Sequence, residues 1–96
     1  MTGSQERNPD ELHFKPGEGV GYSVEDNGLL LVNSKRTETD KLNQKESALW
    51  HLNAYGMNPE SLVNFFSILY GSDGEAQNFV NKTLLRWHSE GYLRRR

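Results

Sequence analysis

The chain has 96 residues, a formal net charge of -2 and no cysteine, so we expect one small domain without disulfides or thiolate metal sites. The acidic balance argues against a protein that covers nucleic-acid phosphates with a basic surface. No apolar run approaches the roughly 18 residues that span a bilayer, and the N-terminus lacks a signal-peptide pattern, so we expect a cytoplasmic protein with no membrane partner.

The N-terminal half contains two apolar strand patterns behind a polar tail. Residues 1–11 are polar and have no apolar period, and we expect them to be disordered. Residues 20–24 alternate between apolar and small or polar side chains, the period of a half-buried strand. Asp26-Asn27-Gly28 suits a tight turn, and the apolar run from Leu29 to Val32 predicts a strand buried on both faces.

A third strand is expected from Thr37 to Leu42, where the residues are polar but tolerate extended backbone. One face would carry Thr37, Thr39 and Lys41, and the other Glu38, Asp40 and Leu42. Charged side chains in a strand that follows an apolar one are typical of a sheet edge, where they discourage unwanted pairing. The three strands predict an antiparallel meander with one polar edge.

After Asn43 the apolar period changes from 2 to 3.6, which predicts helices. Capping boxes are predicted at Asn43 with Glu46 and at Ser72 with Glu75. The helices are expected from Gln44 to about Tyr55, from Asn58-Pro59 to Gly71, and from Ser72 to about Glu90. Their apolar faces are Leu49 and Leu52 in the first, Leu62, Phe65 or Phe66, and Leu69 in the second, and Ala76, Val80, Leu84 and Trp87 in the third.

These patterns predict an α+β domain over residues 12–93, with an N-terminal three-stranded antiparallel sheet followed by three helices. Tyr92 and Leu93 would fold back on the last helix. The arginines at 94–96 would form a basic C-terminal tail in solvent.

No set of side chains suggests catalysis. His13, His51 and His88 lie in different predicted segments, without metal-ligand spacing or cysteine partners. No nucleophile is paired with a base. Trp50 lies beside the apolar face of the first helix, and we expect it to pack at the edge of the core rather than anchor a partner. We therefore expect a protein that is not an enzyme and holds no cofactor or metal.

Several core and cap positions resemble one known family. They are Gly28-Leu29-Leu30-Leu31-Val32-Asn33, Leu42-Asn43, Leu49-Trp50, Leu52, Leu62, Leu69, Val80, Leu84, Trp87 and Gly91-Tyr92-Leu93. Over residues 20–93 the pattern resembles the PqqD-like family, also called RiPP recognition elements, the peptide-binding modules of ribosomal-peptide biosynthesis. Tyr55-Gly56 stands where that family often has Asp-Gly, and Trp87 stands where a leucine is typical.

The resemblance implies a winged-helix-like domain that holds the leader segment of a precursor peptide for a modifying enzyme, such as a radical-SAM enzyme. The leader would add as a strand to the third strand, in the groove between that strand and the third helix. An unpaired edge offers backbone N–H and C=O groups for such pairing. Because Lys82 and Arg86 would line the helix wall, we expect a leader with apolar anchors and flanking acidic residues. The expected peptide-binding residues are Thr37, Glu38, Thr39, Asp40, Lys41, Phe79, Lys82, Thr83 and Arg86.

A winged-helix DNA-binding protein is the alternative. Its recognition helix would be the third helix. The exposed face of that helix is expected to carry Gln77, Asn78, Asn81, Lys82 and Arg86. We rank nucleic acid second as a partner because the chain is acidic overall and the second helix has Glu60 as its only charge, which leaves few cations for phosphates.

Overall fold

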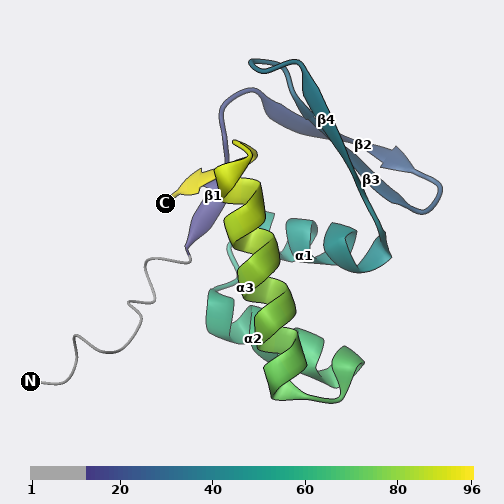
Figure 1. The fold of residues 1–96 in the computed structure, drawn as a ribbon, viewed down its shortest axis with the longest axis vertical. Helices are drawn as coiled ribbons and strands as arrows, with labels where there is room; N and C mark the ends of the chain where they lie inside the picture. The colour runs from purple at the N-terminus through teal and green to yellow at the C-terminus, as the bar shows by residue number, and fades with distance from the viewer. Residues whose placement is uncertain (1–12) are drawn as a thin grey trace, which may run out of the picture.

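The computed structural model describes residues 13–96, so the expected disordered tail at residues 1–11 lies outside the described residues. In chain order the elements are β1 (Phe14–Pro16), β2 (Val20–Glu25), β3 (Gly28–Asn33), β4 (Glu38–Leu42), α1 (Gln44–Ala54), α2 (Pro59–Tyr70), α3 (Asp73–Ser89) and β5 (Leu93–Arg95) (Figure 1). The predicted α+β order, a three-stranded antiparallel sheet followed by three helices, is confirmed. Within residues 13–96 no helix has the length and apolar character to cross a membrane.

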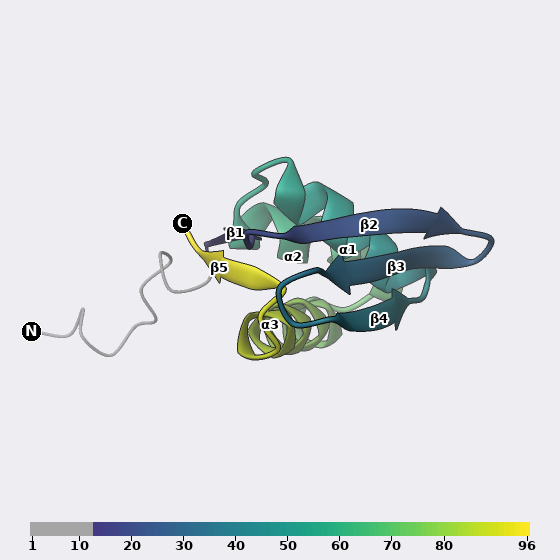
Figure 2. The ribbon, with the colours of Figure 1, turned by 90° about the horizontal axis from the view of Figure 1, so that it is seen from above.

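The main sheet is an antiparallel meander with β3 in the centre and β2 and β4 at its edges. Its tight turn depends on Gly28, where φ is +156° and a Cβ atom would collide with the carbonyl oxygen of Leu42. Seen from above, α3 lies on the β4 side of the sheet, and the β2–β3 hairpin reaches out beyond the helices (Figure 2). Among the described residues, nothing pairs with the two edges of the sheet, one of which runs beside a helix.

Side-chain caps fix where the helices begin. Asn43 accepts a hydrogen bond from the backbone N–H of Glu46, and the Glu46 carboxylate accepts one from the backbone N–H of Asn43, so the predicted capping box of α1 is formed. Asn58 caps α2, as predicted. Ser72 caps α3 through the N–H of Glu75, but the return bond from Glu75 is absent, so the second predicted box is only half formed. The helix bounds agree with the predictions to within a residue at each end.

The core lies between the inner face of the sheet and the three helices. The predicted stripe of α3 is fully buried: Ala76, Val80, Leu84 and Trp87. Trp50 is also buried, and its ring meets that of Trp87 edge to face with centroids 5.3 Å apart, so Trp50 is a core residue. The other buried apolar side chains are Phe14, Leu29, Leu31, Leu42, Leu49, Leu62, Phe66, Tyr92 and Leu93.

Burial departs from the sequence pattern at three places. Tyr22 and Val24 face the same side of the sheet as the buried leucines of β3, yet they are 52% and 76% exposed because the hairpin reaches beyond the helices (Figure 2). The residues from Leu29 to Val32 alternate between buried and half-buried, so this strand is not buried on both faces. In α2 the predicted core residue Leu69 is 55% exposed, since Leu62 and Phe66 supply the buried face.

The C-terminal arginines form a strand instead of the predicted solvent tail. β5 pairs antiparallel with β1, with Arg95 opposite Phe14. The backbone N–H of Arg96 donates to the carbonyl of His13 at 3.0 Å. Leu93 is buried, as expected for a residue that folds back on the helix, whereas the side chain of Arg94 is exposed. The C-terminus is thereby held against the start of the described chain.

Candidate functional site

β4 is an edge strand, and no strand within residues 13–96 pairs with its outer side. Its one neighbour in the sheet is β3, in a register that sets Leu31 opposite Asp40. The predicted third strand is therefore present and lies at an edge, but it begins at Glu38. Thr37, expected as its first residue, belongs instead to the turn and has a φ of +52°, which is left-handed backbone.

The backbone groups of Thr39 and Lys41 face the open side of β4. Successive residues of an antiparallel strand direct their N–H and C=O groups to alternate sides. The N–H of Ser34 donates a hydrogen bond to the carbonyl of Gly19 at 3.0 Å, which shows that the backbone of Ser34 faces β2. Because directions alternate along β3, the backbone groups of Leu31 face the other way, toward β4. Asp40 lies opposite Leu31, so the backbone groups of Asp40 face β3. Thr39 and Lys41, which flank Asp40, therefore point away from the sheet, where a further strand can pair with them.

α3 forms the wall opposite this edge. Lys82 is exposed on it, and Phe79 is half-buried against the rings of Phe66 and Tyr70, with centroids 5.2 and 5.5 Å away. Thr83 is only 7% exposed, so it packs inside the domain more than it faces the groove. The predicted helix residues thus differ in access, and the remaining one, Arg86, is the residue that reaches β4.

Arg86 joins α3 to β4 and to α1. Its Nη2 lies 3.5 Å from Oδ2 of Asp40 and 3.4 Å from Oε2 of Glu46, and its Nε lies 3.9 Å from Oε1 of Glu90. These distances exceed the roughly 2.7–2.9 Å of a strong charge-assisted hydrogen bond, so one guanidinium is shared loosely among three carboxylates. The groove is therefore more acidic than the sequence indicated, because the positive charge of Arg86 is already compensated.

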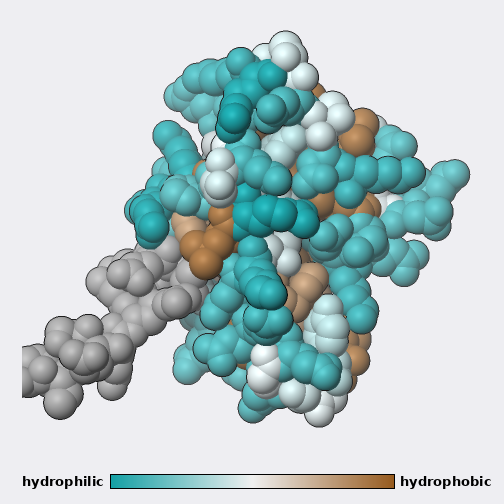
Figure 3. Space-filling model, in the orientation of Figure 1, coloured by the Kyte–Doolittle hydropathy of each residue, from teal (hydrophilic) through white to brown (hydrophobic). Residues whose placement is uncertain are grey.

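A polar hollow of about 420 Å³ lies where β4 meets the C-terminal end of α3. It is lined by Arg36, Glu38, Thr39, Asp40, Ser89, Glu90 and Tyr92. Arg36 extends from the β3–β4 turn to the helix end, where its Nη1 donates to the carbonyl of Glu90 at 2.7 Å and its Nε lies 3.7 Å from Oε1 of Glu38. This face of the molecule is mostly hydrophilic, with apolar residues only in small separate patches (Figure 3). We call this space the upper hollow.

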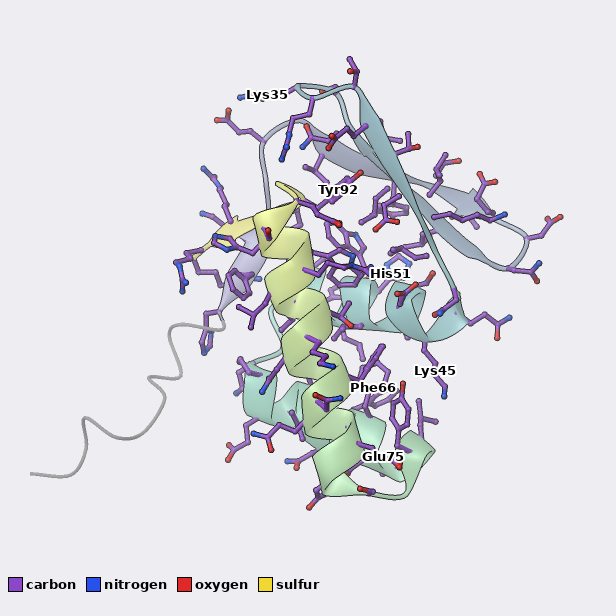
Figure 4. The ribbon with its side chains drawn as sticks, viewed as in Figure 1. Lys35, Lys45, His51, Phe66, Glu75 and Tyr92 are labelled. Atoms are coloured by element: carbon purple, nitrogen blue, oxygen red, sulfur yellow. The ribbon has the colours of Figure 1, made fainter. Side chains whose placement is uncertain are left out.

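Tyr92 brings a hydroxyl group to the upper hollow. Its side chain lies at the end of α3, on the side of the helix that faces β4 (Figure 4). Burial, followed by the nearby carboxylates of Asp40, Glu38 and Glu90, raises the pKa of Tyr92. The hydroxyl therefore keeps its proton at neutral pH and can both donate and accept a hydrogen bond.

A second hollow, of about 410 Å³, lies at the opposite end of β4. It is lined by Asn27, Lys41, Leu42, Asn43 and Glu46. The open edge of β4 thus runs between two recesses. Such an arrangement suits an extended chain that pairs along the strand and places side chains at both ends.

Two of the three histidines pack against aromatic rings. The rings of His51 and Tyr22 lie 5.3 Å apart, and those of His88 and Phe14 lie 5.0 Å apart. In the part of the chain that the structure describes, no three His, Asp or Glu side chains are grouped closely enough to hold a metal ion.

Sequence reasoning did not select Arg36, Glu46, Glu90 or Tyr92 as site residues. One signal was available for Glu90, which follows Arg86 by one helical turn, a spacing that favours ion pairs. Arg36 lies in a turn, and no local pattern shows how far its side chain reaches. Tyr92 is apparent from sequence only as a packing residue, because its position beside β4 depends on the tertiary fold.

No protein-family model and no curated protein matches this sequence. Two solved structures share its fold. One is described as lasso peptide synthetase B1 complexed with the leader peptide; it matches with a TM-score of 0.80 and 16% identity over 85% of this chain and 98% of that chain. The other is TbiB1 in complex with the TbiA(beta) leader peptide, with a TM-score of 0.76 and 19% identity over 82% of this chain and 93% of that chain. The likeness is one of fold, and it confirms the winged-helix-like architecture.

Proposed function

We propose that this domain is a recognition module of the PqqD-like type, which binds the leader segment of a ribosomally synthesised precursor peptide and delivers the precursor to a modifying enzyme. The leader pairs as an added strand with β4 and lies in the groove between β4 and α3. The domain itself performs no chemistry and holds no cofactor.

The observation that supports this proposal most strongly is the open edge of β4, in a fold shared with two proteins described as leader-peptide complexes. The N–H and C=O groups of Thr39 and Lys41 offer an extended peptide hydrogen bonds that do not depend on its sequence. Specificity then comes from side chains beside the strand. The proposed peptide-binding residues are Glu38, Thr39, Asp40 and Lys41 of β4, Thr37 at its entry, and Phe79, Lys82, Thr83 and Arg86 of α3.

The partner enzyme supplies the catalysis. Two classes are proposed for it: a lasso peptide synthetase, the kind of protein named for one structural neighbour, and a radical-SAM enzyme, a class that PqqD-like modules serve. Co-purification of the tagged domain with candidate enzymes of each class, expressed from the native genomic neighbourhood, distinguishes the two. Retention of the precursor peptide in the same complex is expected for a delivery module.

Amide chemical shifts test where the leader binds. The probe is the N-terminal half of a candidate precursor, chosen as a short reading frame in the genomic neighbourhood, and a scrambled peptide of the same composition is the control. We expect shift changes at Thr39 and Lys41 of β4 and at Lys82 and Arg86 of α3. Changes confined to α2 and β5, with β4 silent, would reject strand addition.

The DNA-binding alternative has less support. Arg86, one of its candidate base-reading residues, is engaged with three carboxylates. Besides Lys82, further cations lie on the small sheet, where Arg94 is opposite Lys15. Tight, salt-sensitive binding to duplex DNA that is lost in the Arg94→Ser variant would favour this alternative over leader binding.

A further inference from the structure

We propose that the upper hollow binds a cationic side chain, lysine or arginine, of the leader peptide. This inference rests on the proposed leader-binding function and adds to it the charge of one leader position. The position is one of the two leader residues that pair opposite Glu38 and Asp40 of β4.

The charge of the upper hollow is the first argument. Its lining contributes three carboxylates, those of Glu38, Asp40 and Glu90, against the single guanidinium of Arg36. Arg86 also reaches Asp40 and Glu90, but it divides its charge with Glu46 outside the hollow. The region therefore keeps an excess of negative charge, which attracts a cation and repels an acidic side chain.

The hydroxyl of Tyr92 is an independent argument. Tyr92 is only 2% exposed as a whole residue, but its hydroxyl reaches the upper hollow, and no residue between 13 and 96 forms a hydrogen bond with it. The hydroxyl is therefore available to a ligand that enters the upper hollow. An ammonium or guanidinium N–H donates to the hydroxyl oxygen while its charge is balanced by the carboxylates around it.

The register of strand addition brings a side chain to this place. Glu38 and Asp40 lie on the inner face of the sheet, because they pair with the inward-facing Asn33 and Leu31 of β3. In an added strand, the residues opposite Glu38 and Asp40 point to the same face, over the upper hollow. Opposite charges directly across a strand pair stabilise the pairing.

The occupant is a long side chain and not a metal ion. The carboxylates of the upper hollow are not gathered closely enough to ligate a metal, as no such group occurs within residues 13–96. A volume of about 420 Å³ instead fits the flexible stem and head group of lysine or arginine entering from the peptide backbone. At this end of the groove, a basic leader residue therefore replaces the acidic one that the sequence led us to expect next to Arg86. Lys82, one helical turn earlier in α3, is exposed and can still attract an acidic leader residue.

A peptide selection tests the inference. The full-length domain is immobilised and used to select from a displayed library of random 20-residue peptides. We expect the enriched peptides to share apolar positions and one lysine or arginine at a fixed spacing from them. A domain carrying Glu38→Lys and Asp40→Lys is expected to enrich aspartate or glutamate at that same position.

Affinities of one selected peptide then measure the contact. On the wild-type domain, replacing its basic residue with glutamine should weaken binding about tenfold or more, and so should the combined Asp40→Asn and Glu90→Gln variant. The two changes together should cost little more than either alone, because they remove the same contact. Tyr92→Phe should weaken binding about fivefold. The matched controls are Glu25→Gln and Glu60→Gln, which remove carboxylates far from the groove, and thermal unfolding verifies that each variant is folded.

The outcomes separate this inference from the proposed function. If the enriched peptides lose affinity on Thr39→Pro but share no basic position, the cationic site is overturned and leader binding stands. The same holds if they bind the combined Asp40→Asn and Glu90→Gln variant as well as the wild type. Failure to enrich any peptide, or binding that ignores Thr39→Pro, would reject both. A basic position that exchanges for an acidic one in the lysine variant would establish the site.

Discussion

Thr37 holds the turn between β3 and β4 in a conformation that threonine rarely adopts. Its φ of +52° is the only positive value at a non-glycine residue within residues 13–96. Left-handed backbone costs an ordinary residue about 1–2 kcal/mol, and a β-branched side chain fits it poorly. The turn that contains Thr37 also carries Arg36 over the upper hollow, so the strain lies at the edge of the proposed binding groove.

Thr37→Gly should therefore stabilise the domain. Glycine adopts this φ without steric cost, and we expect the free energy of unfolding to rise by about 0.5–1 kcal/mol. Urea unfolding followed by tryptophan fluorescence measures the change. Thr39→Gly is the matched control, because the same replacement in regular strand backbone should destabilise by about 1 kcal/mol. Equal destabilisation by both variants would show that the turn is unstrained.

At the scale of elements, the two edges of the main sheet differ in what lies beside them. β4 runs next to α3 and between two hollows, whereas β2 belongs to a hairpin that reaches out past the helices (Figure 2). By the alternation that frees Thr39 and Lys41, the N–H groups of Tyr22 and Val24 also point away from the sheet. Proline is tolerated at such outward positions, because no hydrogen bond of the sheet is lost.

Proline should consequently weaken binding at the edge formed by β4 but not at the edge formed by β2. Thr39→Pro keeps the sheet but removes an N–H that an added strand needs, so we expect leader affinity to fall about tenfold or more. Thr39→Ala retains that N–H and should bind nearly as well as the wild type. Val24→Pro, the matched change on the other edge, should leave affinity unchanged. Fluorescence anisotropy with a labelled leader measures all three, and loss of affinity in Val24→Pro alone would move the binding site to β2.

Glu46 links two elements through its two carboxylate oxygens. Oε1 accepts from the backbone N–H of Asn43 in the capping box, and Oε2 faces Arg86 of α3. Glutamine also completes a capping box, so Glu46→Gln should cost only a few tenths of a kcal/mol, the value of a partly exposed ion pair. Glu46→Ala loses the cap as well and should cost about 1 kcal/mol. Thermal unfolding of both variants tests this order, and equal costs would mean that the return bond to Asn43 contributes nothing.

The elements that sequence predicted well are those with local signals. Helix starts at Asn43 and Asn58 follow from cap residues that act within three positions, and the α3 stripe follows from its period. Alternation at Tyr22 and Val24 correctly predicts which residues share a face, but it contains no information on whether a helix covers that face. The edge position of β4 was predictable from its charges, whereas the upper hollow depends on Tyr92 and Glu90 folding back from the far end of α3.

At the scale of the whole molecule, the pairing of β1 with β5 joins segments from opposite ends of the sequence. Both strands have three residues, too short for a period, so no local pattern predicts them. The pairing nevertheless buries Leu93 and holds Phe14 in the core beside α3. Three consecutive arginines look like a solvent tail in the sequence, yet Arg94 and Arg95 pair with β1 through their backbone, and the Arg96 guanidinium donates to the carbonyl of Asn53 at 3.1 Å.

Removal of residues 93–96 should therefore destabilise the domain strongly. The truncation loses the burial of Leu93, worth about 1.5–3 kcal/mol, and also uncovers Phe14 and the end of α3. We expect a loss of about 3–5 kcal/mol, a large part of the roughly 5–15 kcal/mol that stabilises a typical domain. Urea unfolding reports it through Trp50 and Trp87, which are both buried.

Arg94→Ser is the control for this truncation, because it removes an exposed charge but keeps the strand, and it should change stability by no more than about 0.5 kcal/mol. A truncated domain as stable as this control would mean that the C-terminus behaves as a tail. If the truncation is costly while the control is not, the small sheet stabilises α3 at the end that carries Glu90 and Tyr92. The upper hollow would then depend on the pairing of β1 with β5, although no side chain of β1 lines the hollow.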